Sequence, residues 1–268
     1  EYGTIVPMHY MNQDGWAKVV SVAAPLFASW QENRAFGAAV RRAIEASPFN
    51  VAVLASGSLS SELAKRCQST GLPVVLFNRG HADKNLCSVT SDNYAGGKAL
   101  ADYLCSLGHE RIAYIAGFSG ATTQIDREAG FRAGLAEAGK ELYARADGNF
   151  DYRTAQAAAR EIFATSRRPD AVFVANDHMA FAVMDVLRFE LGLRVPEDVS
   201  VVGFDDVPPA AWPAYNLTSF RQRVEQMVAE TVAMLLARID GDESGSPHVV
   251  LGGELIIRGS TRRYGDAR

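Results

Sequence analysis

The segment Leu193-Arg-Val-Pro-Glu-Asp-Val-Ser-Val-Val-Gly-Phe-Asp-Asp206 is the most informative part of this 268-residue chain. Its apolar run, 199–204, predicts a strand buried on both faces, and this strand ends abruptly in two carboxylates. A second apolar run, 171–175, ends in Asn176 and Asp177 and is followed by a helical pattern. The two runs predict a strand–helix–strand unit with parallel strands, whose polar ends emerge at the same edge of the sheet.

The same alternation of strand and helix patterns extends over most of the chain. Further strand candidates lie at 51–55, 73–77, 111–116 and 254–257. Helical apolar stripes lie between the candidates, and the longest runs from Val224 to Ile239. These repeated units predict a doubly wound α/β architecture. Periodicity does not decide between helix and strand in residues 1–49.

The composition is that of an ordinary folded protein. Apolar residues make up 48% and charged residues 22%, which argues against disorder. The length allows two lobes with separate cores. The net charge is −4 and no block of five basic residues occurs, so the chain should not grip nucleic acid by itself. No apolar run approaches the ~20 residues of a membrane span, so we expect no membrane partner.

The cysteine pattern favours neither a disulfide framework nor a zinc site. Cys67, Cys87 and Cys105 are far apart, and no Cys-x-x-Cys or Cys/His cluster occurs. Adjacent strand residues point to opposite faces, so Asp205 and Asp206 should not share a metal ion. We therefore expect no metal and no cofactor. Reduced thiols and the absence of a leader-like pattern in residues 1–7 predict a cytoplasmic protein.

Six phrases of the sequence, in order, resemble the lactose-repressor (LacI/GalR) family of bacterial transcription regulators. They lie at 72–79, 107–117, 126–131, 175–180, 193–206 and 217–222. The similarity is to the effector-binding domain, and it covers residues from about 49 to 262. It implies a periplasmic-binding-protein-like fold of two doubly wound parallel-sheet lobes joined by three crossovers. It places residues 1–107 and 221–242 in the first (N-terminal) lobe, and 108–220 and 249–268 in the second (C-terminal) lobe.

The resemblance also implies a function. The family binds a small-molecule effector between the lobes and thereby controls DNA binding. Its DNA contacts come from a helix-turn-helix headpiece, which this sequence does not contain, so this chain should not read operator DNA itself. We expect an effector-binding and dimerisation core that forms a homodimer and takes a carbohydrate or a sugar derivative.

Asn176 and Asp205 are the first candidate ligand contacts, because open α/β sheets bind ligands at the carboxyl ends of their strands. An aspartate accepts hydrogen bonds through two oxygens, and an asparagine both donates and accepts. This pair suits the vicinal hydroxyls of a sugar or the polar edges of a purine. One of them could instead cap the following helix, but we assign the capping role to Asp177.

The resemblance supplies further candidates. Arg127 falls on the position of the arginine that contacts the effector; the alternative is a solvated arginine paired with an acidic neighbour. Phe150 matches an aromatic residue that stacks on the effector, although core packing would also explain it. Asn78 resembles a pocket position of the first lobe. Gln222 follows a crossover and could reach the cleft or begin the long helix, and Ser56 is a weaker candidate.

Two other functional classes fit parts of the sequence. A periplasmic sugar-binding protein of a transporter has the same two-lobe fold. A serine hydrolase is a remote alternative, because residues 117–121 imitate a nucleophile elbow and Ser119, Asp205 and His248 occur in hydrolase order. Ala121 occupies the last elbow position, however, and His248 lies in a turn without an evident orienting partner. We therefore expect no enzyme.

Overall fold

The computed structural model describes residues 38, 42, 73–80, 86–242 and 244–262. In this part of the chain, one set of strands comprises β3 (Ile112–Ala116), β4 (Ala144–Asp147), β5 (Ala171–Val174), β6 (Ser200–Asp205), β7 (Thr218–Arg221) and β9 (Glu254–Ile256). A second set comprises β1 (Val75–Phe77), β2 (Cys87–Ser91) and β8 (His248–Leu251). The helices are α4 (Asn93–Ser106), α5 (Thr122–Glu137), α6 (Tyr152–Phe163), α7 (Asp177–Asp185) and α8 (Val224–Ile239). A π-helical turn (Val186–Glu190) continues α7, and a 3-10 turn (Pro208–Ala211) follows β6.

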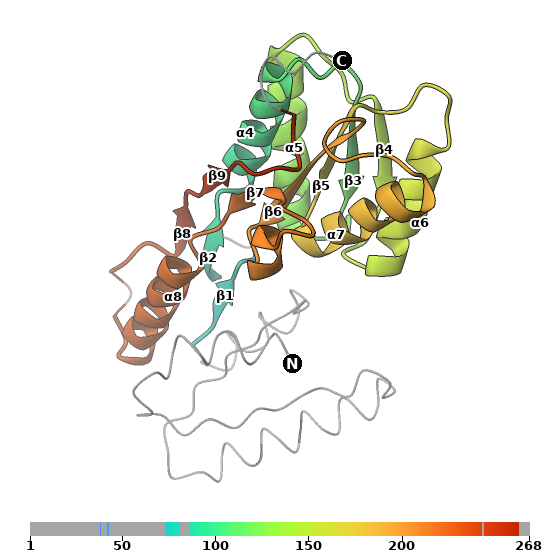
Figure 1. Cartoon of the computed structure of the whole chain (residues 1–268). Coiled ribbons are helices and arrows are strands. Elements are labelled where there is room, and N and C mark those ends of the chain that lie inside the picture. Colours follow the sequence, from blue (N-terminus) through green and yellow to red (C-terminus); the bar gives the residue numbers. More distant parts are fainter. Residues whose placement is uncertain (1–37, 39–41, 43–72, 81–85, 243, 263–268) are drawn as a thin grey trace.

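The strands form two separate sheets (Figure 1). The larger sheet has the order β4-β3-β5-β6-β7-β9, and the smaller one has the order β1-β2-β8. Every neighbouring pair runs parallel except β7 and β9, which are antiparallel. The predicted α/β class with parallel sheets is therefore confirmed.

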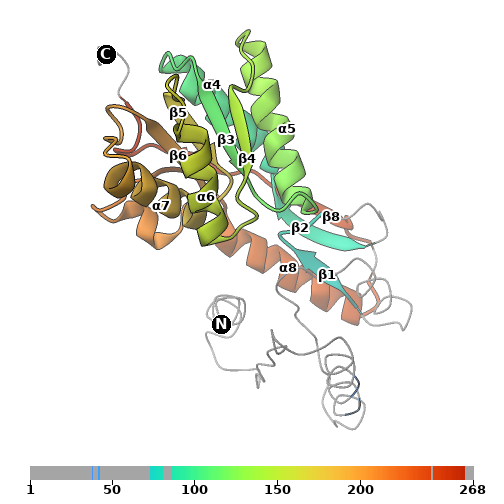
Figure 2. The ribbon, with the colours of Figure 1, turned by 90° about the vertical axis from the view of Figure 1, so that its right-hand side faces the viewer.

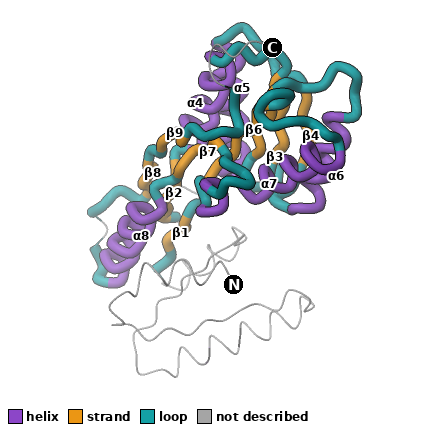
Figure 3. Tube along the Cα trace, viewed as in Figure 1, coloured by secondary structure: helices purple, strands orange, loops and turns teal. Residues whose placement is uncertain are grey.

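Helices cover the larger sheet on both faces. Helices α4 and α5 lie on one face, and α6 and α7 lie on the other (Figures 2 and 3). Helix α8 packs on β1 and β2 of the smaller sheet. Strands β3 and β5 are buried along their whole length, as their continuous apolar runs predict. Parallel strands that are covered in this way bring their carboxyl ends to one edge of the sheet.

Four strands were not recognised in the sequence, namely β2, β4, β7 and β8. Strands β2, β4 and β7 contain polar residues, as in Cys87-Ser-Val-Thr-Ser91, so no apolar run reveals them. Strand β8 has an apolar run of only three residues, 249–251, directly after a turn-like segment. The strand predicted at 51–55 and the candidate Ser56 lie outside the described residues.

Two segments pack against a different sheet from the one that their assigned lobe implies. Helix α4, assigned to the first lobe, packs along α5 on the larger sheet. Strand β8, of which 249–251 were assigned to the second lobe, pairs with β2 in the smaller sheet. Sequence patterns place a helix or a strand along the chain, but they do not show which neighbour it packs against. The chain therefore leaves the smaller sheet at residue 91 and returns to it before residue 248.

Helices α4 and α5 approach each other closely at glycine residues. A Cβ atom on Gly97 would lie 2.1 Å from the carbonyl oxygen of Arg127, and one on Gly130 would lie 2.0 Å from that of Tyr94. No side chain fits at either position while the backbones stay in place. This contact brings the first turn of α4 beside the first turns of α5.

The beginning of β3 is joined to the beginning of β5 by a buried carboxylate. Asp170 lies 3.2 Å from Nδ1 of His109 and accepts hydrogen bonds from the backbone N–H groups of Glu110 (3.3 Å) and Arg111 (3.2 Å). Burial alone would raise the pKa of Asp170, but the hydrogen bonds from His109 and from the two backbone groups hold it well below its usual range. The ionised form is therefore the one that stabilises the fold.

Gly97→Ala should lower the free energy of unfolding by about 1–3 kcal/mol, because the added methyl group forces two helix backbones apart. Chemical denaturation measures this loss. Ala157→Ser, which adds one atom at an exposed position of α6, should change stability by less than about 0.5 kcal/mol. Equal effects of the two substitutions would contradict the close-contact role of Gly97.

Asp170→Asn should cost about 3 kcal/mol at neutral pH, because it replaces a buried carboxylate that accepts hydrogen bonds from the backbone N–H groups of Glu110 and Arg111. The folded-state pKa is depressed, so this stability is present above the unfolded pKa of ~3.9 and is lost as the pH falls through the folded pKa. The difference between variant and wild type should therefore shrink below about pH 4. Urea titrations at several pH values test this. The exposed Asp147→Asn should cost no more than about 1 kcal/mol at any pH.

Candidate functional site

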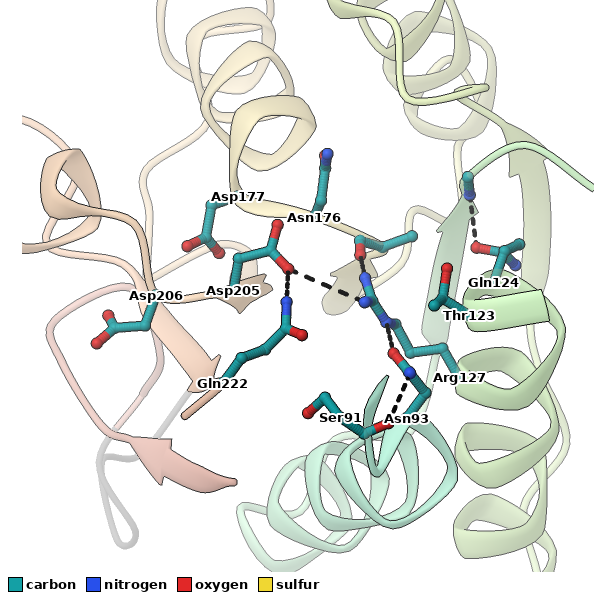
Figure 4. Close-up of polar contacts among 12 residues, drawn as sticks. Ser91, Asn93, Thr123, Gln124, Arg127, Asn176, Asp177, Asp205, Asp206 and Gln222 are labelled. Carbon is teal, nitrogen blue, oxygen red and sulfur yellow. Dashed lines mark hydrogen bonds and ion pairs between the residues drawn. The ribbon is translucent and has the colours of Figure 1, made fainter. Parts of the chain in front are cut away.

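The candidate site lies where β5, β6 and β7 end, beside the first turns of α4 and α5 (Figure 4). The residues that meet there belong to segments far apart in the sequence. Asn93 is the first residue of α4, Arg127 lies in the second turn of α5, and Asp205 ends β6. Gln222 follows β7 directly. The carboxyl edge of the larger sheet is thus the position at which open α/β sheets bind ligands.

Arg127 is the buried centre of this group, with only 3% of its surface exposed. Its Nε donates to Oδ1 of Asn93 (2.9 Å), and its Nη1 donates to the carbonyl oxygen of Ala175. Its Nη2 lies 3.9 Å from Oδ1 of Asp205. The guanidinium carbon lies 3.5 Å from the ring centre of Phe204, a cation–π contact. The solvated alternative for Arg127 is therefore wrong.

Asp205 and Gln222 form a second fixed pair. Nε2 of Gln222 donates to Oδ1 of Asp205 at 2.6 Å. Asp205 has a φ of 117° and Asp206 a φ of 57°, a backbone conformation that L-residues rarely adopt. Strain of this kind persists only where surrounding contacts hold it, and it is common at ligand sites. Here the contacts of both carboxylates hold the strained turn.

The two neighbouring carboxylates have structural partners. Asp206 pairs with Arg221 and Arg258, each at 2.6 Å, and its side chain is nearly inaccessible. Asp177 is fully buried; it accepts hydrogen bonds from Oγ of Ser219 (2.6 Å) and from the backbone N–H of Val207 (2.9 Å). The two side chains tie the turn after β6 to β7 and α7.

The assignment of the helix cap to Asp177 is wrong. The N-cap of α7 is Asn176, whose Oδ1 accepts a hydrogen bond from the backbone N–H of Met179 at 3.0 Å. Asp177 is the first helical residue, so its side chain turns toward β7 instead of its own helix end. Asn176 still lies at the site, and capping occupies its oxygen but not its amide N–H groups.

Burial and charge shift the acidity of these groups. Burial lowers the pKa of Arg127, and the nearby Asp205 opposes this shift. Burial raises the pKa of Asp205, against the effects of Arg127 and Gln222. The pKa of Asp177 is raised well above its usual range by burial and by the neighbouring Asp205. Perturbed, enclosed ionisable groups of this kind are typical of functional sites.

Two contributors to the site were missed in the sequence, namely Ser91 and Asn93. Nδ2 of Asn93 donates to the backbone oxygen of Ser91 at 2.9 Å, and the Oγ of Ser91 is buried without a hydrogen-bond partner among the described residues. Ser91 ends the polar strand β2, which was not recognised in the sequence, and Asn93 begins α4 two residues later. If the sequence had predicted a parallel strand that ends at Ser91, both residues would have been expected at the carboxyl edge of a sheet.

The segment after β1 connects the smaller sheet to α5. Asn78 has a φ of 51° and a buried Oδ1 that has no partner among the described residues. Nη1 of Arg79 donates to Oγ1 of Thr123 (3.1 Å), and the backbone N–H of Gly80 donates to Oγ1 of Thr122 (3.0 Å). Burial lowers the pKa of Arg79. The predicted candidate Asn78 thus lies in a segment that contacts the start of α5.

Phe150 lies at the carboxyl end of the sheet, just beyond β4. It has a φ of 58°, and a Cβ atom on Gly117 would lie 2.1 Å from its ring. The ring therefore covers Gly117 and packs against the core. Contact of the ring with an effector stays a prediction.

The residues of the hydrolase alternative have other partners. His248 lies in β8, where its Nδ1 is 3.0 Å from Oγ of Ser88, and Asp205 contacts Gln222 and Arg127. Ser119 is exposed in the turn before α5. In the described part of the chain, no three His, Cys, Asp or Glu residues are grouped as a metal site would require. No described helix is long and apolar enough to span a membrane.

Comparison with models of protein families matches residues 101–261 to the periplasmic binding protein-like domain. A second model, the catalytic LigB subunit of aromatic ring-opening dioxygenase, matches residues 1–115. That match covers less than half of the chain and falls mostly outside the described residues, so it assigns no activity.

Curated relatives with similar sequences are transcription regulators. The HTH-type transcriptional regulator CelR of Thermobifida fusca is 36% identical over 202 residues, which are 74% of this chain and 59% of CelR. The HTH-type transcriptional repressor PurR of Vibrio vulnificus is 31% identical over 194 residues, 72% of this chain and 58% of PurR. The chain thus spans less than two thirds of the length of these relatives.

Solved structures agree with the sequence relatives. A complex of the transcriptional regulator CelR with cellobiose has a TM-score of 0.81 and 30% identity, covering 97% of this chain and 78% of that one. A regulatory protein of the LacI family from Chloroflexus aggregans has a TM-score of 0.75 and 28% identity. The match covers 86% of this chain and 83% of that one. The chain therefore belongs to the periplasmic binding protein-like domain family, in the form found in LacI/GalR transcription regulators.

Proposed function

We propose that this chain is the effector-sensing core of a LacI/GalR transcription regulator and that it binds a carbohydrate at the site around Arg127 and Asp205. One observation supports this most directly. A buried arginine, Arg127, lies 3.9 Å from the partly exposed carboxylate of Asp205, beside two buried polar atoms, Oε1 of Gln222 and Oγ of Ser91, that have no partner among the described residues. Buried polar atoms are normally paired in folded proteins. Hydroxyl groups of a sugar would satisfy them.

The proposed contacts come from both sheets. Asn78 and Ser91 lie at the ends of β1 and β2, whereas Arg127, Asn176, Asp205 and Gln222 surround the carboxyl edge of the larger sheet. Phe150 offers a ring for the apolar face of a sugar. We also keep Ser56 as a proposed contact. A ligand that touches both sheets would favour one arrangement of the two lobes over others.

We propose that this ligand-dependent change in the arrangement of the lobes regulates DNA binding. In the whole protein a DNA-binding headpiece would respond to the lobe arrangement, and effector and operator would change each other's affinity by the same factor. We place the protein in the cytoplasm, where operator DNA lies, and propose a homodimer, because operator half-sites are read by paired headpieces. A solution mass of one chain in the full-length regulator would contradict the dimer.

The complex of the similar regulator CelR with cellobiose makes a β-linked glucose disaccharide the first ligand to test. Thermal unfolding in the presence of cellobiose, other disaccharides, monosaccharides and purines should show one clear stabilising class. A ligand at 100 times its Kd that binds only the folded state adds ~2.7 kcal/mol. Stabilisation by purines and not by any sugar would contradict the carbohydrate proposal.

Asp205→Asn should weaken sugar binding by about 10- to 100-fold, because hydrogen bonds to charged groups contribute about 1.5–3 kcal/mol. Isothermal titration calorimetry measures the change. The neighbouring Asp206→Asn provides a matched control: it should lower the melting temperature, since Asp206 pairs with Arg221 and Arg258, but leave the Kd within about twofold. Loss of binding in Asp206→Asn alone would contradict the assigned site.

A further inference from the structure

We infer that Thr122 and Arg79 regulate the site by acting in opposite directions on the two lobes: the Thr122 hydroxyl holds the lobes together, and the charge of Arg79 drives them apart. The smaller-sheet lobe comprises β1, β2, β8 and α8, and the larger-sheet lobe comprises the other described elements. The inference rests on the proposed function and concerns how effector binding is regulated. It predicts that loss of the positive charge at residue 79 strengthens effector binding.

The segment that follows β1 belongs to the smaller-sheet lobe. The backbone N–H of Asn78 donates to the backbone oxygen of Val89 in β2 at 2.8 Å, so this segment is fixed to the smaller sheet. The next two residues, Arg79 and Gly80, contact the start of α5, which lies on the larger sheet. These contacts therefore join the two lobes through groups that are not part of a crossover.

The Thr122 hydroxyl holds the two lobes together through two hydrogen bonds with one residue. The backbone N–H of Gly80 donates to Oγ1 of Thr122 at 3.0 Å, and Oγ1 donates to the backbone oxygen of Gly80 at 3.2 Å. A hydroxyl suits this position because it can accept and donate at the same time. Neutral hydrogen bonds contribute only modestly to stability, so this contact favours the observed arrangement of the lobes without fixing it.

Arg79 brings a second positive charge close to the buried Arg127. Nη1 of Arg79 donates to Oγ1 of Thr123 at 3.1 Å. Thr123 precedes Arg127 by four residues on α5, and helical residues with this spacing lie on the same face (Figure 4). Burial lowers the pKa of Arg127, Asp205 raises it, and the charge of Arg79 lowers it again. Two guanidinium groups from different lobes thus repel each other.

The charge of Arg79 is not compensated by a carboxylate. Among the described residues Arg79 forms no ion pair, whereas Arg127 has Asp205 at 3.9 Å. Asp126 also lies near the start of α5, but burial and the charge of Asp92 raise its pKa, whereas a paired arginine would lower it. Like charges that are partly buried repel each other more strongly than charges in water. Separation of the lobes would relieve this repulsion.

The two opposed contributions make the arrangement of the lobes responsive to the effector. If the hydrogen bonds dominated, the lobes would stay together without a ligand, and binding would change little. If the repulsion dominated, few molecules would be competent to bind, and the apparent affinity would fall by that fraction. When the two nearly cancel, a ligand that contacts both lobes can shift the population.

Two substitutions with opposite expected effects test the inference by calorimetry with cellobiose. Arg79→Gln removes the charge but keeps an amide donor for Thr123, and it should tighten binding by about fivefold or more. Thr122→Val keeps the shape of the side chain but removes the hydroxyl, and it should weaken binding by about the same factor. Arg153→Gln, which removes a charge from an exposed position of α6, should leave the Kd within about twofold. Unchanged or weaker binding by Arg79→Gln would overturn the inference.

Small-angle X-ray scattering of the unliganded chain provides a second measurement that needs no sugar. The radius of gyration of Arg79→Gln should be smaller than that of the wild type, and that of Thr122→Val should be larger, at concentrations where all three have the same mass. Equal radii would overturn the inference even if cellobiose binds. Absence of binding by every sugar would instead contradict the proposed function, and the scattering would still decide the inference.

Discussion

The burial of one guanidinium group, that of Arg127, links the helices and strands around the candidate site. An arginine is removed from water only if its donors and its charge find partners, because an unpaired buried charge costs several kcal/mol. Arg127 finds them in three elements: Asn93 at the start of α4, Ala175 beyond β5 and Asp205 at the end of β6. Its contacts thereby fix the distances between α4, α5 and the carboxyl edge of the larger sheet.

The close contact between α4 and α5 and the strained turn at Asp205 and Asp206 both help to position the partners of Arg127. Gly97 and Gly130 let the backbones of α4 and α5 touch, which brings Asn93 within reach of Arg127. On the other side, Asp205 and Asp206 adopt positive φ values, so the chain turns sharply where β6 ends. Consecutive carboxylates then serve different purposes, since Asp205 faces the cluster while Asp206 is neutralised by two arginines. Backbone strain at this place is offset by these ion pairs and hydrogen bonds.

Residues from both sheets contribute to the same cluster. Ser91 ends a strand of the smaller sheet, and Arg79 and Gly80 after β1 contact the hydroxyls of Thr123 and Thr122 on α5. These contacts are hydrogen bonds between polar groups. A ligand that pairs with polar atoms of both sheets adds its hydrogen bonds only in the arrangement that presents all of them together. Differential affinity of this kind is what a sensor requires.

The alternation of strands and helices, the parallel α/β class and the position of Asn176 and Asp205 at the sheet edge could all be predicted from the amino-acid sequence. These features are local, since apolar runs and polar strand ends can be read within about ten residues. Long-range packing, in contrast, makes Asn176 the cap of α7 and lets Asp177 bind Ser219, 42 residues away. It also decided the orientation of Gln222 and the roles of Ser91 and Asn93. Those depend on contacts between distant segments, such as the one from Arg127 to Asn93, which local periodicity does not encode.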